Sequence, residues 1–200
     1  MPKVSQAYLT ARREQILIAA VACFSREGFH QTTMQDIVKE SGLSPGSLYL
    51  YFKSKEELVE AIAQRRHKRE WALIREAARE RDTNAAFRKL MAGFFDTLRN
   101  HQEQQDRRLA LQLWAEALRN PAVLRSVRRG VNEPRRLLGA IIRKAKQRGE
   151  LLGDADADGM ARVMIALFQG CVLQLAWDPK MKLEPFVRTV ERLFEGLSVD

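Results

Sequence analysis

Small, hydroxylated and aromatic side chains gather in one short stretch, the run Ser-Pro-Gly-Ser-Leu-Tyr-Leu-Tyr at residues 44–51. Hydroxyl groups bind phosphate oxygens and base edges, and apolar groups contact the methyl group of thymine. A glycine lets a backbone come close to a ligand because it lacks a Cβ atom. Leu48 and Phe52 are four residues apart and would share one buried helical face, which leaves the other side chains pointing outward. The stretch therefore has the composition of a surface that approaches DNA.

Two short helices joined by a tight turn would position this surface. Thr33 is suited to an N-cap, and Asp36 stands three residues later, at the capping-box spacing. Gly42 is suited to end that helix in the left-handed conformation. Ser44 can cap a second helix with Pro45 at its first position, where no N–H is needed. The pattern predicts a helix-turn-helix motif whose second helix is the recognition helix.

The motif also carries a family resemblance. The run TTMQDIVKESGLSPGSLYLYFKSKEELVEAI, which starts at Thr32, resembles the DNA-binding core of the TetR family of bacterial transcriptional regulators. The resemblance implies an all-α fold of about nine helices. It would have an N-terminal three-helix helix-turn-helix DNA-binding domain at residues 10–70 and a C-terminal helical ligand-binding and dimerisation domain at residues 71–200.

The function that this resemblance implies is transcriptional regulation by a ligand-responsive protein. We expect a homodimeric repressor that binds double-stranded DNA at a palindromic operator, an inverted repeat, and is released by a small-molecule effector. A transcriptional activator or a ligand-independent repressor of the same fold is the alternative. A helical dimer that binds no DNA, or an enzyme, is the remote alternative.

Matching positions within the motif gives the candidate DNA contacts. They are Thr33, Gln35, Ser44, Pro45, Gly46, Ser47, Tyr49, Leu50, Tyr51 and Lys55. Thr33 and Lys55 are expected to hold phosphates, and Tyr49 and Tyr51 to reach phosphates or thymine methyls. The recognition helix lacks Arg and Asn, so specificity is expected to depend on apolar contacts and DNA shape, with Gln35 as the remaining amide.

The rest of the chain has the apolar spacing of helices and no useful period-2 run. A helix at residues 10–26 follows a terminal arm at residues 1–9, and another helix begins after Ser54. A basic run at residues 65–69 within that helix is expected to be a solvated surface. Further helices are predicted from Thr83 or Asn84, at 109–118 after a polar connection at 101–105, from 121 to 148, at 157–177 and at 184–197.

The last two helices are predicted to form a dimer interface. The penultimate helix is apolar on nearly every side, so it needs partners on more than one face. Two helices from each of two subunits would make a four-helix bundle, as the resemblance also implies. The expected interface residues are Met160, Val163, Met164, Leu167, Cys171, Leu175, Phe186, Val190, Leu193 and Phe194.

The middle helices supply candidates for an effector pocket, because aromatic side chains with a few amides suit an amphipathic molecule. The candidates are Phe94, Phe95, Leu98, Leu111, Trp114, Phe168, Gln169, Gln174 and Trp177. The segment from Leu109 to Pro121 also resembles the sensor domains of BetI-like family members. The next helix region is strongly basic, and its positive charges either bind an anionic effector or face only solvent. The basic residues are Arg125, Arg128, Arg129, Arg135, Arg136, Arg143, Lys144, Lys146 and Arg148.

The net charge of the chain is consistent with DNA binding but does not indicate which part of the chain binds DNA. The 200-residue chain is 46% hydrophobic and 30% charged, with a net charge of +9, as expected for a folded globular protein with a polyanionic partner. Residues 1–70 carry a net charge of +3, residues 71–150 of +9 and residues 151–200 of −3. The motif is therefore not in the most basic part of the chain.

Other function classes have little support in the sequence. The histidines His30, His67 and His101 lack metal-ligand spacing, and no catalytic triad or Gly-rich phosphate loop is present, so we expect no enzyme activity, cofactor or metal site. Cys23 and Cys171 are expected to be buried reduced thiols. Neither a signal sequence nor an apolar run of about 18 residues is expected, which favours a cytoplasmic protein with no membrane partner.

Overall fold

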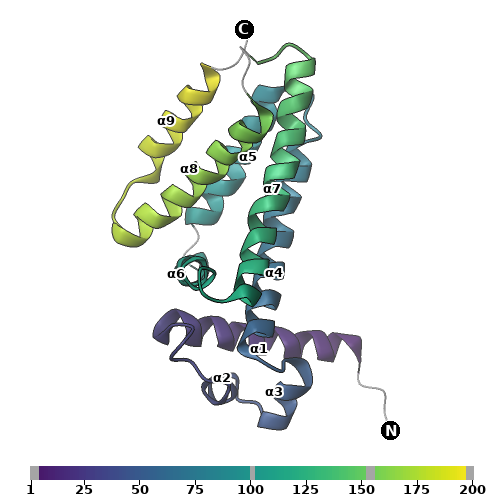
Figure 1. The fold of residues 1–200 in the computed structure, drawn as a ribbon, viewed down its shortest axis with the longest axis vertical. Helices are drawn as coiled ribbons and strands as arrows, with labels where there is room; N and C mark the ends of the chain where they lie inside the picture. The colour runs from purple at the N-terminus through teal and green to yellow at the C-terminus, as the bar shows by residue number, and fades with distance from the viewer. Residues whose placement is uncertain (1–4, 100–101, 152–155, 197–200) are drawn as a thin grey trace. The chain divides into compact units, whose positions relative to one another are not determined.

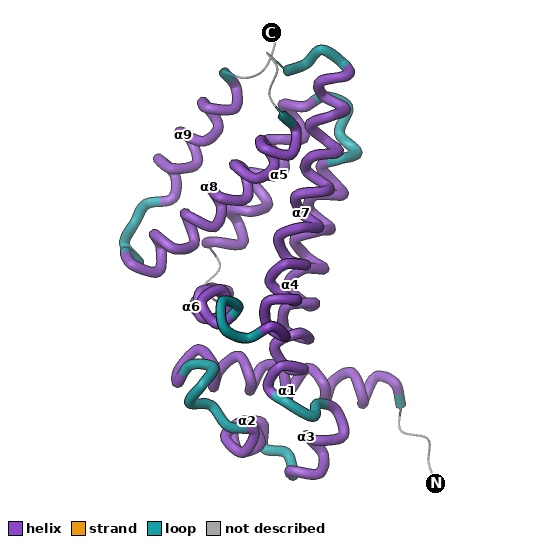
Figure 2. Tube along the Cα trace, in the orientation of Figure 1, coloured by secondary structure: helices purple, strands orange, loops and turns teal. Residues whose placement is uncertain are grey.

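The computed structural model describes residues 5–99, 102–151 and 156–196 of the chain. Within these ranges the regular structure consists of nine α-helices without a strand (Figure 1). Figure 2 shows loops and turns between the helices wherever the connecting residues are described. The helices are α1 (Gln6–Glu27), α2 (Met34–Ser41), α3 (Pro45–Tyr51), α4 (Lys55–Ala77), α5 (Thr83–Arg99), α6 (Gln102–Glu116), α7 (Pro121–Gln147), α8 (Ala157–Trp177) and α9 (Leu183–Glu195). The predicted all-α class with about nine helices is confirmed.

The helices form two compact units. The first unit comprises Met1–Arg65 and Gln104–Val127, and the second comprises Arg66–Glu103 and Arg128–Asp200. Helices α4, α6 and α7 each contribute residues to both units. Most of α6 and the start of α7 therefore belong to the packing unit of the motif. The roles predicted for residues 10–70 and 71–200 stay predictions.

One hydrophobic core holds the first unit together. Ile16 and Phe24 of α1 are fully buried, as are Ile37 of α2 and Leu48 of α3. The same cluster includes Leu58, Val59, Ala61 and Ile62 of α4, Leu109 and Leu113 of α6, Ala117 directly after α6, and Val123 of α7. Burying a Leu, Ile or Phe side chain stabilises a fold by about 1.5–3 kcal/mol. The two-helix motif is thus held in place by packing against residues of α1, α4, α6 and α7.

A polar contact joins α6 to the loop between α1 and α2. Glu116, the last residue of α6, lies with its carboxylate 2.6 Å from His30 Nε2. The Glu116 side chain is 8% exposed, whereas that of His30 is 71% exposed. This pairing is not predictable from the sequence, because the two residues are far apart along the chain.

Most helix boundaries follow the predicted caps, with two exceptions. α1 begins at Gln6 with Ser5 as its N-cap, so residues 6–9 are helical and not a terminal arm. α6 begins at Gln102, so the polar residues 102–105 belong to a helix and not to a connection. Glu and Gln have favourable helix propensities, so polarity alone does not make a loop. The predictions for residues 1–4, 101 and 197 lie outside the described residues.

Aromatic pairs connect the helices of the second unit, where α5 packs against α9. The ring pairs, with their centroid distances, are Phe87–Phe194 (4.5 Å), Phe95–Phe186 (5.9 Å) and Phe94–Phe168 (5.2 Å). Such pairs contribute about 0.5–1.5 kcal/mol each beyond their buried area. They fix α5 against both α8 and α9.

Helices α4 and α7 approach closely at Gly130. A Cβ atom at that position would lie 2.3 Å from His67 Nε2, so a larger residue requires His67 to move. His67 is 3% exposed and stacks on Trp71, with ring centroids 5.3 Å apart. Burial, with the positive charges of Arg66 and Arg129, lowers the pKa of His67 to about 4. The prediction that the whole run 65–69 is a solvated surface is therefore wrong at His67.

Helix α8 is the most apolar helix of the second unit. By length and composition, Ala157–Trp177 could cross a membrane, and it is the one such helix among the described residues. The expectation that no run is long and apolar enough is therefore wrong. Only 22% of its apolar window is buried. A helix that packs on partners at more than one face has the same composition.

Candidate DNA-binding and effector sites

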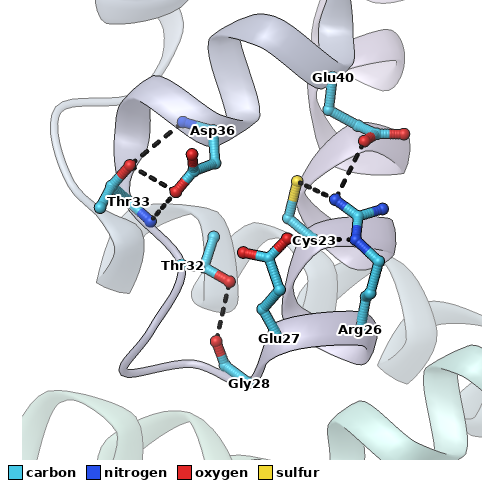
Figure 3. Close-up of polar contacts among 8 residues, drawn as sticks. All are labelled: Cys23, Arg26, Glu27, Gly28, Thr32, Thr33, Asp36 and Glu40. Carbon is cyan, nitrogen blue, oxygen red and sulfur yellow. Dashed lines mark hydrogen bonds and ion pairs between the residues drawn. The ribbon is translucent and has the colours of Figure 1, made fainter.

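A capping box closes the N-terminus of α2, as the sequence predicts (Figure 3). The Asp36 N–H donates to Thr33 Oγ1 (3.2 Å), while Asp36 Oδ2 accepts from the Thr33 hydroxyl (2.6 Å) and N–H (2.9 Å). The hydroxyl first, and then the N–H, lowers the pKa of the Asp36 carboxyl by stabilising its charged form. A phosphate would have to be held by the hydroxyl and N–H of Thr33, and both groups are already bonded in this cap. The phosphate contact of Thr33 therefore stays a prediction.

Helix α3 begins with the predicted Ser-Pro pair. Gly42 ends α2 with φ at 66°, in the left-handed region, and Ser44 caps α3. Ser44 Oγ accepts from the Ser47 N–H (3.3 Å), and the Ser44 hydroxyl donates to Ser47 Oγ (3.0 Å). Pro45 and Gly46 are exposed, and a Cβ atom on Gly46 would meet no described atom within 4 Å. The start of the recognition helix therefore presents backbone and small groups to solvent.

The later side chains of α3 divide between core and solvent. Leu48 is fully buried and Phe52, directly after the helix, is 3% exposed, as their spacing predicts. Leu50 is 80% exposed and Tyr49 is 38% exposed. Tyr51 is half-buried and packs against the hydrophobic core of the first unit. Of the two predicted tyrosine contacts, Tyr49 has the more open side chain.

Two lysines beside the end of α3 are held by the protein itself. Lys53 Nζ donates to the carbonyl oxygen of Tyr49 (2.7 Å). Lys55 Nζ donates to the carbonyl oxygens of Phe29 (2.6 Å) and His30 (3.3 Å), and it lies 4.6 Å from the centroid of the Phe29 ring. Lys55 therefore ties the start of α4 to the loop between α1 and α2, a role that sequence reasoning missed. A phosphate contact by Lys55 stays a prediction.

Other exposed polar groups border the motif. Gln35 and Lys39 of α2 are exposed. Arg13 of α1 is exposed and lies over the ring of Phe52, with its guanidinium carbon 5.2 Å from the ring centroid. These side chains supply an amide and positive charge beside the recognition helix, and an arginine near a phosphate-binding surface suits DNA.

The nine predicted pocket residues are divided between the two units. Leu111 and Trp114 lie in the first unit, and the other seven lie in the second. Within the second unit Phe94 and Phe168 are in ring contact. The remaining five range from core to surface: Phe95 and Leu98 are buried, Gln169 is half-buried, and Gln174 and Trp177 are exposed. The pocket assembled from these residues stays a prediction.

The second unit contains a cavity among α5, α7, α8 and α9, with a volume of about 470 Å³ including its opening to solvent. Its lining residues are Thr83, Asn84, Phe87, Leu90, Leu138, Ile141, Ile142, Leu151, Met160, Met164 and Phe194. None of the nine predicted pocket residues lines it, whereas three predicted interface residues do. The spacing of Leu138, Ile141 and Ile142 at i, i+3 and i+4 is the signal that could have found it.

Thr83, one of the lining residues of this cavity, is hydrogen-bonded to a carboxylate that is not itself part of the lining. Glu150 accepts from the N–H of Thr83 (2.9 Å) and from its hydroxyl, and it pairs with Arg148 (2.7 Å). The Thr83 hydroxyl is the main cause that lowers the pKa of Glu150. An apolar cavity with a few polar groups at one end is suited to an amphipathic ligand.

The apolar side chains of the predicted dimer face are only partly covered within the second unit. Cys171 and Val190 are buried, and the other eight predicted residues are half-buried or exposed, up to 54% for Val163 and 60% for Leu193. The assignment of this face to a dimer stays a prediction.

The predicted burial of both thiols, Cys23 and Cys171, is confirmed, and burial raises the pKa of Cys23.

Several basic residues of α7 are already paired with carboxylates. Arg135 Nη1 lies 3.5 Å from Asp158, and Arg136 Nη2 lies 2.7 Å from Glu133. Both pairs are partly exposed, so solvent screens them and they contribute little to stability. Because these carboxylates offset part of the positive charge, an anionic ligand on α7 has no direct support in the packing.

Two family patterns match the chain. The pattern of the bacterial regulatory proteins of the TetR family matches residues 16–62, which hold the capped motif. The pattern of the BetI-type transcriptional repressor C-terminal region matches residues 86–198, more than half of the chain. The chain belongs to the TetR family. It is a DNA-binding transcriptional regulator and not an enzyme, and its resemblance to BetI-like sensor domains is confirmed.

Relatives whose similarity extends beyond the motif agree with this TetR-family assignment. The transcriptional regulator UidR of Escherichia coli K12 is 28% identical over 92% of both chains. The structure of Salmonella enterica GusR is similar over 98% of both chains, with a TM-score of 0.80 and 29% identity. SmeT, the repressor of the Stenotrophomonas maltophilia multidrug efflux pump SmeDEF, is similar over 94% of this chain and 91% of its own, with a TM-score of 0.74 and 25% identity.

Proposed function

We propose that this TetR-family regulator is a homodimeric repressor that binds an inverted-repeat operator in the cytoplasm and is released by a small-molecule effector. The observation that supports it most is the pairing of two features. A capped recognition helix exposes Gly46, Tyr49 and Leu50, and the apolar face of α8 and α9 is left uncovered. A surface of the first kind suits DNA, and one of the second kind suits a second copy of the chain.

Residues 10–70 would read the operator. Exposed side chains of α2 and α3 would enter the major groove, with Gln35, Ser47, Tyr49 and Leu50 near base edges and phosphates. Thr33 and Lys55 would reach phosphates only by exchanging their present internal partners. Tyr51, half-buried against the core, would position the helix as much as contact the DNA.

The homodimer would be formed through the uncovered face of α8 and α9. Two-fold symmetry presents two recognition helices to successive or alternate major grooves, which recur about every 34–36 Å along B-DNA. An inverted-repeat operator follows from that symmetry. If the dimer neutralises on the order of eight phosphates, log affinity should fall against log salt concentration with a slope of roughly −7.

Residues 71–200 would hold the effector as well as the dimer interface. The apolar cavity among α5, α7, α8 and α9, with Thr83 and Asn84 at one end, favours a small amphipathic molecule over a highly charged one. Release from the operator requires only that the effector bind one conformation better. A coupling free energy of about 1–3 kcal/mol changes DNA affinity by about 5–150-fold.

The test is gel-shift binding of the full chain to the DNA upstream of its own gene, beside a scrambled duplex, in a salt series. Tyr49→Ala should abolish selective binding, whereas Leu118→Ala, at a leucine 87% exposed outside the motif, should not. Small amphipathic compounds that dissolve the complex would support the effector assignment.

Three results would bear against parts of the proposal. Equal, salt-sensitive binding to both duplexes would mean that only the net positive charge acts there, and genomic fragments would then be screened for a selective complex. Absence of binding to every fragment at low salt would contradict the operator assignment. A monomer in sedimentation at micromolar concentration would contradict the homodimer.

A further inference from the structure

The serine hydroxyl groups at the start of the recognition helix are used within the protein, which leaves the hydroxyls of Tyr49 and Tyr51 as its other polar side-chain groups. Ser44 and Ser47 are bonded to each other through their hydroxyl groups, and the Ser44 oxygen also caps the helix. Lys53, the nearest lysine, donates to the carbonyl oxygen of Tyr49. The helix itself, Pro45–Tyr51, carries no Arg, Lys, Asn or Gln. Recognition of base edges by hydrogen bonds therefore has few groups available on α3.

Leu50 is the large apolar side chain that α3 leaves open. It is 80% exposed, while Leu48 and Phe52, two residues to either side, are 0% and 3% exposed. Leu50 thus lies on the helix face opposite to the core. An exposed leucine contributes nothing to the packing of the first unit, so its side chain is free to be covered by a ligand.

The major groove offers one apolar group for such a side chain. The 5-methyl group of thymine projects into the groove, and none of the other three bases has a comparable group there. We propose that Leu50 contacts the 5-methyl group of one thymine in each half-site and that this contact selects thymine at that position. The inference rests on the proposed function, because it requires α3 to enter the major groove.

The experiment replaces each operator thymine in turn by deoxyuridine, which removes only the methyl group, at both symmetry-related positions. Affinities are measured for the full-length wild type and for Leu50→Ala by gel shift and fluorescence anisotropy. Burial of one methyl group corresponds to a factor of about 4 in affinity, or about 15 for the two half-sites. At one thymine, the wild type should lose about that factor on replacement by deoxyuridine.

Leu50→Ala should bind the thymine operator more weakly than the wild type and should bind the thymine and deoxyuridine duplexes equally at that same position. Leu118→Ala is the matched control, since Leu118 is 87% exposed in the same unit but outside the motif. It should keep both the wild-type affinity and the wild-type response to deoxyuridine. An unchanged thermal unfolding curve would show that Leu50→Ala remains folded, as expected for an exposed position.

Two results would overturn the inference while leaving the proposed function intact. The first is a wild type that binds its operator selectively yet ignores every replacement by deoxyuridine. The second is a Leu50→Ala variant with the same response as the wild type at every thymine, because another side chain would then contact the methyl group. Loss of selective binding to any DNA would overturn the inference together with the operator assignment, so the two failures are distinguishable.

Discussion

The two units of this regulator treat their apolar residues differently. In the first unit, side chains from α1, α2, α3, α4, α6 and α7 form one buried cluster. In the second unit, eight of the ten apolar residues predicted for the interface are half-buried or exposed, and a cavity remains among four helices. The first unit satisfies its hydrophobic requirement alone. The second leaves apolar side chains partly exposed, and the proposed effector and second copy of the chain would cover them.

This difference agrees with the tasks that each unit has in the proposed function. A surface that reads DNA must hold its contacts in fixed geometry, and a dense core with capped helices provides that rigidity. A sensing and assembling surface must leave apolar area uncovered in the single chain, because binding free energy comes from covering it. Four substitutions test this contrast.

The largest effect is expected for Phe24→Ala in the first unit. Phe24 is fully buried, and its ring centroid lies 5.6 Å from that of Phe29, so truncation leaves a cavity in the core. We expect the free energy of unfolding to fall by about 3–5 kcal/mol in urea titrations. Ile18→Ala on the same helix, at a side chain 59% exposed, should cost less than about 0.5 kcal/mol. Equal losses in the two variants would contradict a densely packed core in the first unit.

The uncovered face of the second unit should respond through assembly. Leu193 is 60% exposed, so Leu193→Asp should leave the fold of one protomer intact. In a dimer it would bury an unpaired charge from each subunit and weaken association by roughly 3 kcal/mol, about a hundredfold in the dissociation constant. Sedimentation velocity measures this change. Leu118→Asp in the first unit introduces the same charge and should not shift the monomer–dimer equilibrium. An unaltered equilibrium for Leu193→Asp would show that α9 is not part of the interface.

A pH-dependent loss of stability is expected from His67 in the second unit. Its pKa is lowered to about 4 in the folded protein, chiefly by burial, while the unfolded chain has an ordinary value near 6.5. The unfolded state therefore binds the proton first as pH falls. The stability associated with neutral His67 is complete above about pH 6.5 and is lost between about pH 6.5 and 4.

The size of this loss is at most about 3.5 kcal/mol, because the shift is about 2.5 pKa units and each unit corresponds to about 1.4 kcal/mol. Urea unfolding at a series of pH values measures it. His67→Gln removes the titrating group, so its unfolding free energy should decline less between pH 6.5 and 4.5 than that of the wild type. Parallel curves for the two proteins would show that His67 does not titrate differently on folding.

The smallest effect is expected at the cap of α2. Thr33→Ala removes the hydroxyl that accepts from the Asp36 N–H, and we expect a loss of about 1 kcal/mol in unfolding free energy. Thr189→Ala makes the same chemical change on α9, where the hydroxyl donates only to the Pro185 carbonyl oxygen (2.8 Å), and should be nearly neutral. A neutral Thr33→Ala would show that the core alone fixes α2.

Local chemistry explains which parts of the fold were predictable. The capping box at Thr33, the left-handed Gly42 and the Ser-Pro start of α3 each depend on residues within one turn of one another. The inward positions of Leu48 and Phe52 follow from helical spacing alone. The start of α1 was misplaced because a helix of favourable residues continues to the first cap available, which is Ser5.

The candidate sites were predictable only in part. The spacing on α3 correctly divided buried from exposed positions, but it did not reveal that Ser44 bonds to Ser47 or that Lys55 holds the loop after α1. The predicted effector residues share a residue type, mostly aromatic or amide, but come from separate helices. The cavity formed elsewhere because the distance between side chains on different helices depends on how those helices pack.

The sequence by itself determined the helices, their caps, the helix-turn-helix motif and the family, because each depends on local spacing and residue type. Tertiary structure alone decided that α6 and the start of α7 join the core of the motif and that Glu116 meets His30. It also decided that His67 is buried against Gly130 while the α8–α9 face stays open. Such contacts join residues far apart in the chain, and their pairing is set by the packing of whole helices, which no short stretch of sequence contains.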